Sequence, residues 1–398
     1  MINITDKNKK DCCGCTACAN VCPKNCISMV RDSEGFKYPC VDENTCVNCG
    51  LCEKVCPLIN KPKVEDKPLK AYIARNSDPE IVKASTSGGF VSALCKKIIN
   101  NGGIVFGGAF DKDFNVKHTY AEDISSLSKF RSSKYVQSDL LNIFSDVKKQ
   151  LESNRLVMFT GTPCQVAGLH NFLRKKYDNL FTVDFVCRAV PSPLVWERYR
   201  ELMSDKFNSQ IVYANFREKT YGYHSANLTL RFANGKKSIE NTKTDYMLKS
   251  FFSGICSRPS CYDCGFRSAG RVSDLTVFDC WNITRYVPEL EDDDKGYTAV
   301  FVQSQKGAEM ISDIDDAVFY DADIDMLLKN DGFMALQNPK MHPKRSEYFE
   351  LLDNNVPLDK VVQTFVPIKF SRKLAGKTRI ILYKLGLLNK LKKLKSKG

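Results

Sequence analysis

The stretch "CCGCTACANVCP" (residues 12–23) decides how the first part of the chain folds, because it holds five cysteines within eleven positions. Cysteine at this density needs a bonding partner, since alanine or valine would fill a core without the risk of oxidation. The partner is another cysteine, a zinc ion or an iron-sulfur cluster. The spacing of the cysteines and the rest of the sequence decide among these three.

The spacing C-x2-C-x2-C-x3-C-P occurs twice in the first 57 residues, ending in Cys22-Pro23 and in Cys56-Pro57. It is typical of [4Fe-4S] clusters, because a tight loop supplies three thiolates around one face of the cube. Zinc sites seldom use three cysteines at this spacing. The sequence therefore predicts two [4Fe-4S] clusters, held by Cys12, Cys15, Cys18, Cys22, Cys46, Cys49, Cys52 and Cys56.

Each copy resembles the motif of bacterial two-cluster ferredoxins, in which the fourth cysteine ligates the other cluster. The resemblance assigns one cluster to Cys12, Cys15, Cys18 and Cys56, and the other to Cys22, Cys46, Cys49 and Cys52. Three further cysteines lie outside the pattern, and we expect them to be buried packing residues: Cys13, Cys26 and Cys40.

The length and the cysteine distribution limit the class of protein. At 398 residues the chain is too long for one growing core, which favours two domains or one domain with appendages. A disulfide scaffold would be short and secreted, and the first residues show no apolar run with a cleavage site. No stretch reaches ~20 uninterrupted apolar residues. We therefore expect a cytoplasmic protein whose clustered thiols bind metal.

Most of the net charge of +13 comes from the end of the chain. Residues 369–398 hold 11 Lys and Arg and no acidic residue, which leaves the rest of the chain nearly neutral. Leucine and isoleucine alternate there with lysine at roughly helical spacing. This pattern predicts either an interfacial helix in peripheral contact with an anionic membrane or a solvated tail. We expect no nucleic-acid partner, because aromatic side chains are not interleaved with the basic ones.

Beyond a linker at residues 61–68, the pattern changes from cysteine-rich loops to alternating strands and helices. Strands are predicted over 69–75, 103–110, 155–161 and 180–187, with helices near 89, over 138–152, from about 165 and after 193. This alternation favours a largely parallel sheet. From residue 211 an antiparallel segment with an Asn234-Gly235 turn follows. The predicted fold is an α+β ferredoxin-like domain followed by an α/β domain with a mixed sheet.

Five motifs in the body of the chain occur in a recognisable order. They are "ASTSGGFVSAL" (84–94), "SSKYVQS" (132–138), "GTPCQVAGL" (161–169), "DFVCRAVPSPLVWERY" (184–199) and "RPSCYDCGFRSAGRVSDLT" (258–276). Together they resemble the coenzyme F420 hydrogenase/dehydrogenase beta-subunit family over roughly residues 1–340. The resemblance implies FAD and a third [4Fe-4S] cluster, in a 69–340 oxidoreductase domain between a 1–60 ferredoxin domain with its linker and a 341–398 extension.

The resemblance also assigns the third cluster to Cys164, Cys187, Cys261 and Cys264. The residues themselves allow this, because two of these cysteines end adjacent predicted strands and two lie in a loop that can close over them. Cys256 competes for one position, and Cys164 or Cys187 could instead be a core residue.

For the flavin, "STSGG" offers hydroxyls and glycine amides at the positive end of a helix. Lys134 is expected to pair with phosphate or reduced flavin and Tyr135 to stack on a ring, with a solvated loop as the alternative. His224 is the candidate proton donor, against a structural role. The expected cofactor-binding residues are Ser85, Thr86, Ser87, Gly88, Gly89, Lys134, Tyr135 and Thr162.

The chain departs from the family at two places. It has Cys187-Arg188-Ala189 where members commonly show Cys-His-Gly, and "FDCWN" (278–282) where they commonly show Gly-Asp-Phe-Trp-Gly. These differences bear on which second substrate the protein binds, and above all on whether it binds coenzyme F420.

The predicted function is an iron-sulfur flavoprotein oxidoreductase that passes electrons between ferredoxin-type clusters and FAD. It would exchange a hydride with a small organic substrate or a deazaflavin, and take electrons from, or give them to, a ferredoxin or an enzyme subunit. The alternatives are a non-catalytic electron-transfer subunit serving a partner enzyme and a scaffold that keeps clusters only for shape.

Overall fold

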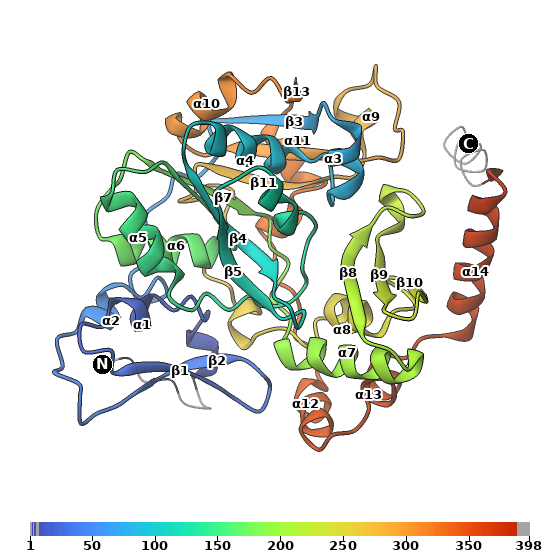
Figure 1. Cartoon of the computed structure of the whole chain (residues 1–398), viewed down its shortest axis with the longest axis horizontal. Coiled ribbons are helices and arrows are strands. Elements are labelled where there is room, and N and C mark those ends of the chain that lie inside the picture. Colours follow the sequence, from blue (N-terminus) through green and yellow to red (C-terminus); the bar gives the residue numbers. More distant parts are fainter. Residues whose placement is uncertain (1, 3, 5–7, 388–398) are drawn as a thin grey trace. The chain divides into compact units, whose positions relative to one another are not determined.

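The computed structural model describes residues 2, 4 and 8–387 (Figure 1). The chain forms two compact units. The first comprises Met1–Leu194 and Ser257–Lys340, and the second Val195–Cys256 and Met341–Gly398. Each unit is therefore built from two separate segments of the chain. The predicted domain boundaries at residues 60, 68 and 340 stay a prediction.

The first unit opens with the cysteine-rich segment, which is α+β as predicted. A hairpin of β1 (Ile27–Arg31) and β2 (Lys37–Val41) accompanies two short helices, α1 (Ala17–Val21) and α2 (Leu51–Lys54). Cys13 and Cys26 are buried, as expected for packing residues. The same expectation was wrong for Cys40, which is exposed on β2 although Tyr38 and Pro39 before it are buried.

The largest element of the first unit is an eight-stranded mixed sheet of order β13-β3-β12-β11-β7-β6-β4-β5. The strands are β3 (Lys70–Asn76), β4 (Ile104–Phe110), β5 (Val116–Ala121), β6 (Val157–Gly161), β7 (Leu180–Phe185), β11 (Leu275–Cys280), β12 (Tyr297–Val302) and β13 (Ala317–Asp321). The four predicted strands are confirmed as β3, β4, β6 and β7.

The sheet is less parallel than the alternation of strands and helices predicted. Among the described strands, the parallel pairs are the central ones, β4 with β6, β6 with β7, and β7 with β11. β12 returns antiparallel beside β11, and β3 is antiparallel to both of its neighbours. The helix predicted from residue 138 begins only at 143, because Asp139 instead pairs with Lys117 of β5.

Helices cover the sheet on both faces (Figure 1). Val105 and Met158 pack with α4 on one face, whereas Phe106 and Phe159 pack with α5 and α6 on the other, as strand alternation requires. The helices of this unit beyond the cysteine-rich segment are α3 (Pro79–Ala84), α4 (Phe90–Asn100), α5 (Ile143–Glu152), α6 (Pro163–Leu173), α9 (Ile283–Tyr286), α10 (Gln305–Ser312) and α11 (Ile324–Lys329).

The cysteine-rich segment and the sheet share one of these cores. Cys13, Cys15, Ala17 and Val55 belong to the same buried cluster as the apolar residues of α5 and α6. The ferredoxin-like segment is therefore packed against the helix that begins at Pro163.

The second unit contains the antiparallel segment, which is confirmed. Its strands are β8 (Ile211–Glu218), β9 (Asn227–Phe232) and β10 (Lys237–Asn241), and Gly235 has a φ of +80° in the turn between the last two. Its helices are α7 (Pro193–Phe207), whose first two residues belong to the first unit, α8 (Tyr246–Ser253), α12 (Arg345–Asp353), α13 (Leu358–Phe365) and α14 (Phe370–Lys384).

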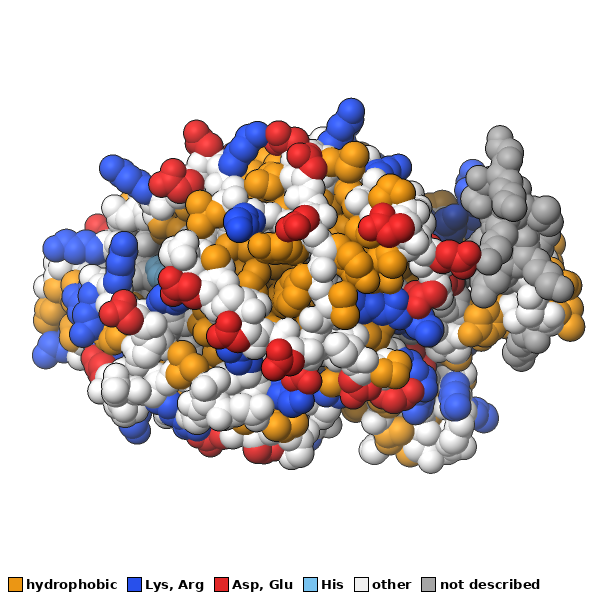
Figure 2. Space-filling view, turned by 90° about the horizontal axis from the view of Figure 1, so that it is seen from above, with side chains coloured by type: hydrophobic (Ala, Val, Ile, Leu, Met, Phe, Trp, Pro, Cys, Tyr) orange, Lys and Arg blue, Asp and Glu red, His pale blue; other side chains and the backbone are white. Residues whose placement is uncertain are grey.

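The basic tail forms helix α14 over part of its length, and residues 388–398 lie outside the described residues. Among residues 2, 4 and 8–387, no helix combines the length and the apolar character needed to cross a membrane. Acidic and basic side chains are intermixed on the face seen in Figure 2, in keeping with the near-neutral body of the chain.

Candidate iron-sulfur and cofactor site

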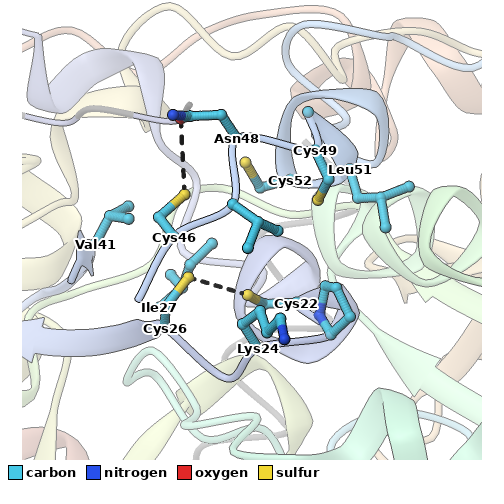
Figure 3. A pocket seen from close by; sticks show the side chains of 13 residues that line it. Cys22, Lys24, Cys26, Ile27, Val41, Cys46, Asn48, Cys49, Leu51 and Cys52 are labelled. Atoms are coloured by element: carbon cyan, nitrogen blue, oxygen red, sulfur yellow. Dashed lines mark hydrogen bonds between the residues drawn. The ribbon is translucent and has the colours of Figure 1, made fainter. Parts of the chain in front are cut away.

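The second ferredoxin-type set of cysteines surrounds a single pocket (Figure 3). Cys22 follows α1, Cys46 and Cys49 lie in the loop before α2, and Cys52 lies within α2. Cys26 lines the same pocket, with its sulfur 3.3 Å from that of Cys22. The pocket therefore gathers the four residues that the ferredoxin resemblance assigns to one cluster, together with a fifth thiol.

The cysteines of the first ferredoxin-type set are more deeply buried than those of the second set. Burial raises the pKa of Cys18 to about 12, with further increases from Cys12 and Cys56. The pKa of Cys56 responds in the same way to burial and to Cys12. Thiols that repel one another in this way ionise only when a cation is bound among them. An iron-sulfur cluster supplies that cation, so the donor set fits a cluster.

Two of the predicted ligands of the third cluster lie at the carboxyl ends of neighbouring parallel strands. Gly161 of β6 pairs with Asp184 of β7, which places the two strand ends side by side. Cys164 lies in the first turn of α6, directly after β6, and Cys187 follows β7. Ligands of α/β sheets bind at such strand ends.

The other two predicted ligands come from the loop that begins with the 3-10 helix η4 (Pro259–Cys261). Burial raises the pKa of Cys187, and the nearby thiols of Cys261, Cys164 and Cys264 raise it further. The amide of Val190 donates a hydrogen bond to the Cys261 sulfur at 3.5 Å. The competitor Cys256 instead lies buried in the second unit, near Tyr348.

Arg267 joins the loops that carry this third group. Its guanidinium donates to the backbone carbonyls of Cys187 and Met334, and to that of Arg188 at 2.5 Å. Its Nε and the amide of Cys264 both donate to Oδ1 of Asn338, at 3.2 and 3.1 Å. One arginine thus fixes the positions of two predicted ligands.

The first ferredoxin-type set and the third group are in contact. Cys13 and Cys15 are buried in one apolar cluster, and Cys164 packs against that cluster. A Cβ atom on Gly168 of α6 would lie 2.9 Å from the Cys15 sulfur, so that residue must be glycine for the helix to pack there. Within the described residues, no three His, Cys, Asp or Glu side chains converge as ligands of a single metal ion.

The two motifs predicted to bind flavin lie side by side. Thr86 Oγ1 lies 3.1 Å from Ser133 Oγ and accepts a hydrogen bond from the Ser133 amide at 2.8 Å. The Ser87 hydroxyl and the Gly88 amide both contact Thr298 Oγ1 at 3.0 Å. Gly89 has a φ of +77° immediately before α4. The "STSGG" loop is therefore held in shape by its own contacts, and Ser85 is buried beside it.

Lys134 is not on a solvated loop, which corrects that alternative. Its ammonium donates to the carbonyls of Arg131 and Ser132 at 3.1 and 3.2 Å and lies 5.7 Å from the centre of the Phe110 ring. Burial lowers its pKa to about 8. Tyr135 lies near Arg188.

Thr162 and His224 lie in different units. The Thr162 hydroxyl lies 3.1 Å from the Cys164 sulfur, and the Thr162 amide donates to Oε1 of Gln165. His224 is half-buried in the 3-10 helix η3 (Tyr223–Ser225) of the second unit, with its ring 5.3 Å from that of Tyr223. The other predicted cofactor residues belong to the first unit.

Sequence reasoning missed a polar network behind Cys164. His118 Nε2 donates to the Thr160 carbonyl at 2.9 Å, and Nδ1 of the neutral ring accepts from the Ser138 hydroxyl at 2.8 Å. Gln165 Nε2 donates to the same Ser138 oxygen at 3.1 Å. Burial lowers the pKa of His118 to about 4, so the ring is neutral.

Two arginines were also missed, although the sequence held a signal for them. Arg258 and Arg267 flank the Cys-x2-Cys pair in "RPSCYDCGFR" (258–267). Arginine beside metal-binding cysteines supplies donors to backbone carbonyls and thiolates in a fixed geometry.

Two family descriptions match the chain. Residues 154–324 match the family described as the C terminus of the coenzyme F420 hydrogenase/dehydrogenase beta subunit, and residues 11–58 match the 4Fe-4S dicluster domain. The first range contains the third cysteine group, and the second contains both ferredoxin-type sets.

Individual proteins are similar over parts of the chain. An uncharacterised protein of Methanocaldococcus jannaschii is 26% identical over 339 residues, 76% of this chain and 86% of the relative. The coenzyme F420-dependent sulfite reductase of the same organism is 29% identical over 166 residues, 40% of this chain but only 24% of that enzyme. The F420-reducing [NiFe] hydrogenase complex from Methanosarcina barkeri contains a chain similar at 18% identity and a TM-score of 0.42, covering 77% of this chain and 94% of that one.

The body of the chain and its N-terminal segment thus match separately, in the order in which the sequence motifs occur. Residues 154–324 therefore resemble the C terminus of the coenzyme F420 hydrogenase/dehydrogenase beta subunit, and residues 11–58 form a 4Fe-4S dicluster ferredoxin domain.

Proposed function

We propose that this protein is an iron-sulfur flavoprotein oxidoreductase with three [4Fe-4S] clusters and FAD. The observation that carries the proposal is the contact between cysteine groups: Cys13 and Cys15 are buried in one apolar cluster, and Cys164 of the third group packs against it. Three groups of thiols in a continuous series suit stepwise electron transfer, whereas isolated structural sites would not need to touch.

When bound, the clusters would exchange single electrons, and FAD would supply the two-electron hydride chemistry with a small organic substrate or a deazaflavin. The chain's own residues hold, orient and enclose these groups. The proposed cluster ligands are Cys12, Cys15, Cys18 and Cys56, then Cys22, Cys46, Cys49 and Cys52, then Cys164, Cys187, Cys261 and Cys264.

The shared apolar core keeps water away from the contact between cysteine groups. Cys13, Cys15 and Ala17 are buried with Val166 and Leu169 of α6. Exclusion of water strengthens the effect of nearby charges and hydrogen bonds on a redox group.

For the flavin, the support is a pre-shaped backbone. Gly88 has no room for a side chain, since a Cβ there would lie 2.6 Å from the Ala74 carbonyl and 2.8 Å from the Thr298 amide. Gly89 follows at the start of α4, where helix amides favour an anion such as a pyrophosphate. We propose that this loop, with Ser85, Thr86 and Ser87, binds FAD, and that Lys134, Tyr135 and Thr162 line the same site. His224 remains our candidate proton donor.

Coenzyme F420 is one of several candidates for the second substrate. The family description and the sulfite reductase relative favour it. The departure at "FDCWN" weighs against it, because Phe278 is not open to a ligand. Its ring packs 4.9 Å from that of Phe301 and fills the space above Gly332.

Anaerobic purification of the full chain tests the proposal. We expect about twelve irons and as many sulfides per chain, one FAD, and a flavin spectrum that a low-potential ferredoxin bleaches. Reoxidation by a small molecule or a deazaflavin would identify an enzyme. Bleaching without turnover until a partner protein is added would identify the electron-transfer subunit, and clusters without flavin would identify a scaffold. A colourless or zinc-containing protein would rule out the whole proposal.

The basic tail adds a weaker proposal, peripheral contact with an anionic membrane. Leu374, Ile381 and Leu385 are exposed on or just after α14, which suits an interfacial helix. Co-sedimentation of the full chain with anionic but not neutral vesicles would support it, and sedimentation with neither would favour a solvated tail.

A further inference from the structure

Arg258 is among the largest fully buried side chains of the described residues, with an exposed fraction of 1%. Within the part of the chain that the structure describes, its hydrogen bonds go to neutral oxygens and to one sulfur, and no carboxylate pairs with it. A buried cation without a counterion is costly to the fold. Its location therefore needs an explanation.

The guanidinium makes hydrogen bonds to the first ferredoxin-type loop. Nε donates to the Cys12 carbonyl at 2.7 Å, and Nη2 lies 3.5 Å from the Cys12 sulfur. Nη2 also donates to the Lys37 carbonyl at 3.0 Å, and Nη1 to Oε1 of Gln137 at 3.0 Å. Gln137 in turn donates to the Cys13 carbonyl at 3.1 Å. Every donor group of the fork is thus directed toward the loop that carries Cys12 or toward its immediate neighbours.

The surroundings leave room for this side chain and for little else. The Tyr38 ring lies 4.2 Å from the guanidinium carbon and the Phe36 ring 5.4 Å. A Cβ on Gly14 would lie 2.9 Å from Arg258 Nη1 and 2.7 Å from Gln137 Nε2. The glycine between Cys12 and Cys15 therefore makes the close approach of the arginine possible.

The backbone of Arg258 belongs to the other side, the third cysteine group. Its amide donates to the Val190 carbonyl at 3.0 Å, and its carbonyl accepts from the Cys261 amide at 2.9 Å. The Val190 amide donates to the Cys261 sulfur. Arg258 is the N-cap residue of η4, the 3-10 helix that ends at Cys261. One residue is therefore shared by two of the three cysteine groups.

We propose that Arg258 is a positioning residue that raises the reduction potentials of the cluster on Cys12 and of the cluster on Cys164, Cys187, Cys261 and Cys264. A cluster with four thiolates is an anion that gains a further negative charge on reduction, so a nearby cation and a hydrogen bond to a ligand sulfur favour the reduced form. The cluster on Cys22, Cys46, Cys49 and Cys52 has no described contact with Arg258. The inference rests on the proposed function, since it requires the clusters.

Potentiometric titration of the full chain, followed by EPR under anaerobic conditions, tests this inference. In Arg258→Gln, we expect two of the three potentials to fall by at least ~59 mV, a tenfold change in each one-electron equilibrium constant. The third potential should not move. Cys49→Ser, which perturbs the pocket of Figure 3, assigns that unmoved signal.

Arg258→Lys decides the test if the glutamine variant fails to fold. It keeps the charge but loses the planar fork, so we expect a smaller fall confined to the same two clusters. The matched control is Arg155→Gln, which removes a different arginine of the first unit that donates to the carbonyls of Gly102 and Gly103. It should leave all three potentials unchanged.

Unchanged potentials in both Arg258 variants, or an equal fall in all three clusters, would overturn the role of Arg258 while leaving the proposed function intact. A wild-type protein without iron would overturn both. Iron content of each variant, measured beside the potentials, separates these outcomes.

Discussion

The two ends of the cysteine series are built in opposite ways. The pocket around Cys22, Cys46, Cys49 and Cys52 is assembled from residues within 31 positions of one another, and Cys49 is exposed. The third group gathers Cys164, Cys187, Cys261 and Cys264 from two strand ends and a distant loop. A local site depends on its own loop geometry, whereas the non-local site depends on the whole sheet. In the proposed function, electrons would enter at the pocket that holds the exposed Cys49, and the third group would lie next to the flavin.

The largest expected effect comes from breaking the non-local site. Cys187→Ala should remove one cluster, about four of twelve irons, and slow flavin reduction by the ferredoxin partner by roughly 100-fold or more. Iron analysis and stopped-flow absorbance measure both quantities. Cys95→Ala is the matched control, because Cys95 is equally a cysteine of the first unit but lies in the core on α4. Loss of iron in the control, or none in Cys187→Ala, would contradict the assignment.

Breaking the local site should do less damage. Cys46→Ser should also lose up to about four irons, but FAD and the EPR signal of the third cluster should remain, because the pocket touches neither site. Electron entry from the ferredoxin partner would slow, whereas a small chemical reductant should still bleach the flavin. Loss of flavin in this variant would mean that the two regions are not independent.

The junction between the two regions offers a matched pair of glycines. Gly14 and Gly102 have φ values of +72° and +73°, but a Cβ would meet Arg258 and Gln137 at the first and nothing within 4 Å at the second. Gly102→Ala should cost about 1 kcal/mol from backbone strain alone. Gly14→Ala should cost about 2–4 kcal/mol, since the clash is added. Thermal unfolding under anaerobic conditions measures the difference, and equal costs would mean that the arginine moves aside freely.

The smallest expected effect separates ligand cysteines from the others. Cys40 is exposed on β2 and lines no cysteine pocket in the described structure. Cys40→Ser should leave the iron content unchanged and the free energy of unfolding within about 0.5 kcal/mol. A loss of iron would place Cys40 among the ligands.

The same contrast explains how much could be predicted from the sequence. Spacing predicted the four cysteines of the local pocket as cluster ligands and the ferredoxin resemblance grouped them, and the structure places all four around one pocket. The strands β3, β4, β6 and β7 were found from apolar runs, but the antiparallel return of β12 beside β11 was not, because strand direction depends on which neighbours pair.

The non-local site was predicted through the resemblance. Spacing cannot reveal that Cys164 packs against the cluster that contains Cys13, or that Arg258 reaches Cys12 across 246 positions. The partial burial of Lys134 was missed for the same reason, since it depends on Phe110 and on a turn that folds back over the side chain.

The core that Cys13, Cys15, Ala17 and Val55 share with α5 and α6 has a consequence for how such a chain can be divided. A fragment starting after residue 60 would expose Val166, Leu169 and neighbouring apolar side chains to water, and would tend to aggregate. The ferredoxin segment is therefore not an independent domain that can be exchanged without changing the rest of the chain. Any attempt to exchange it for another electron carrier must also redesign the helix surface against which it packs.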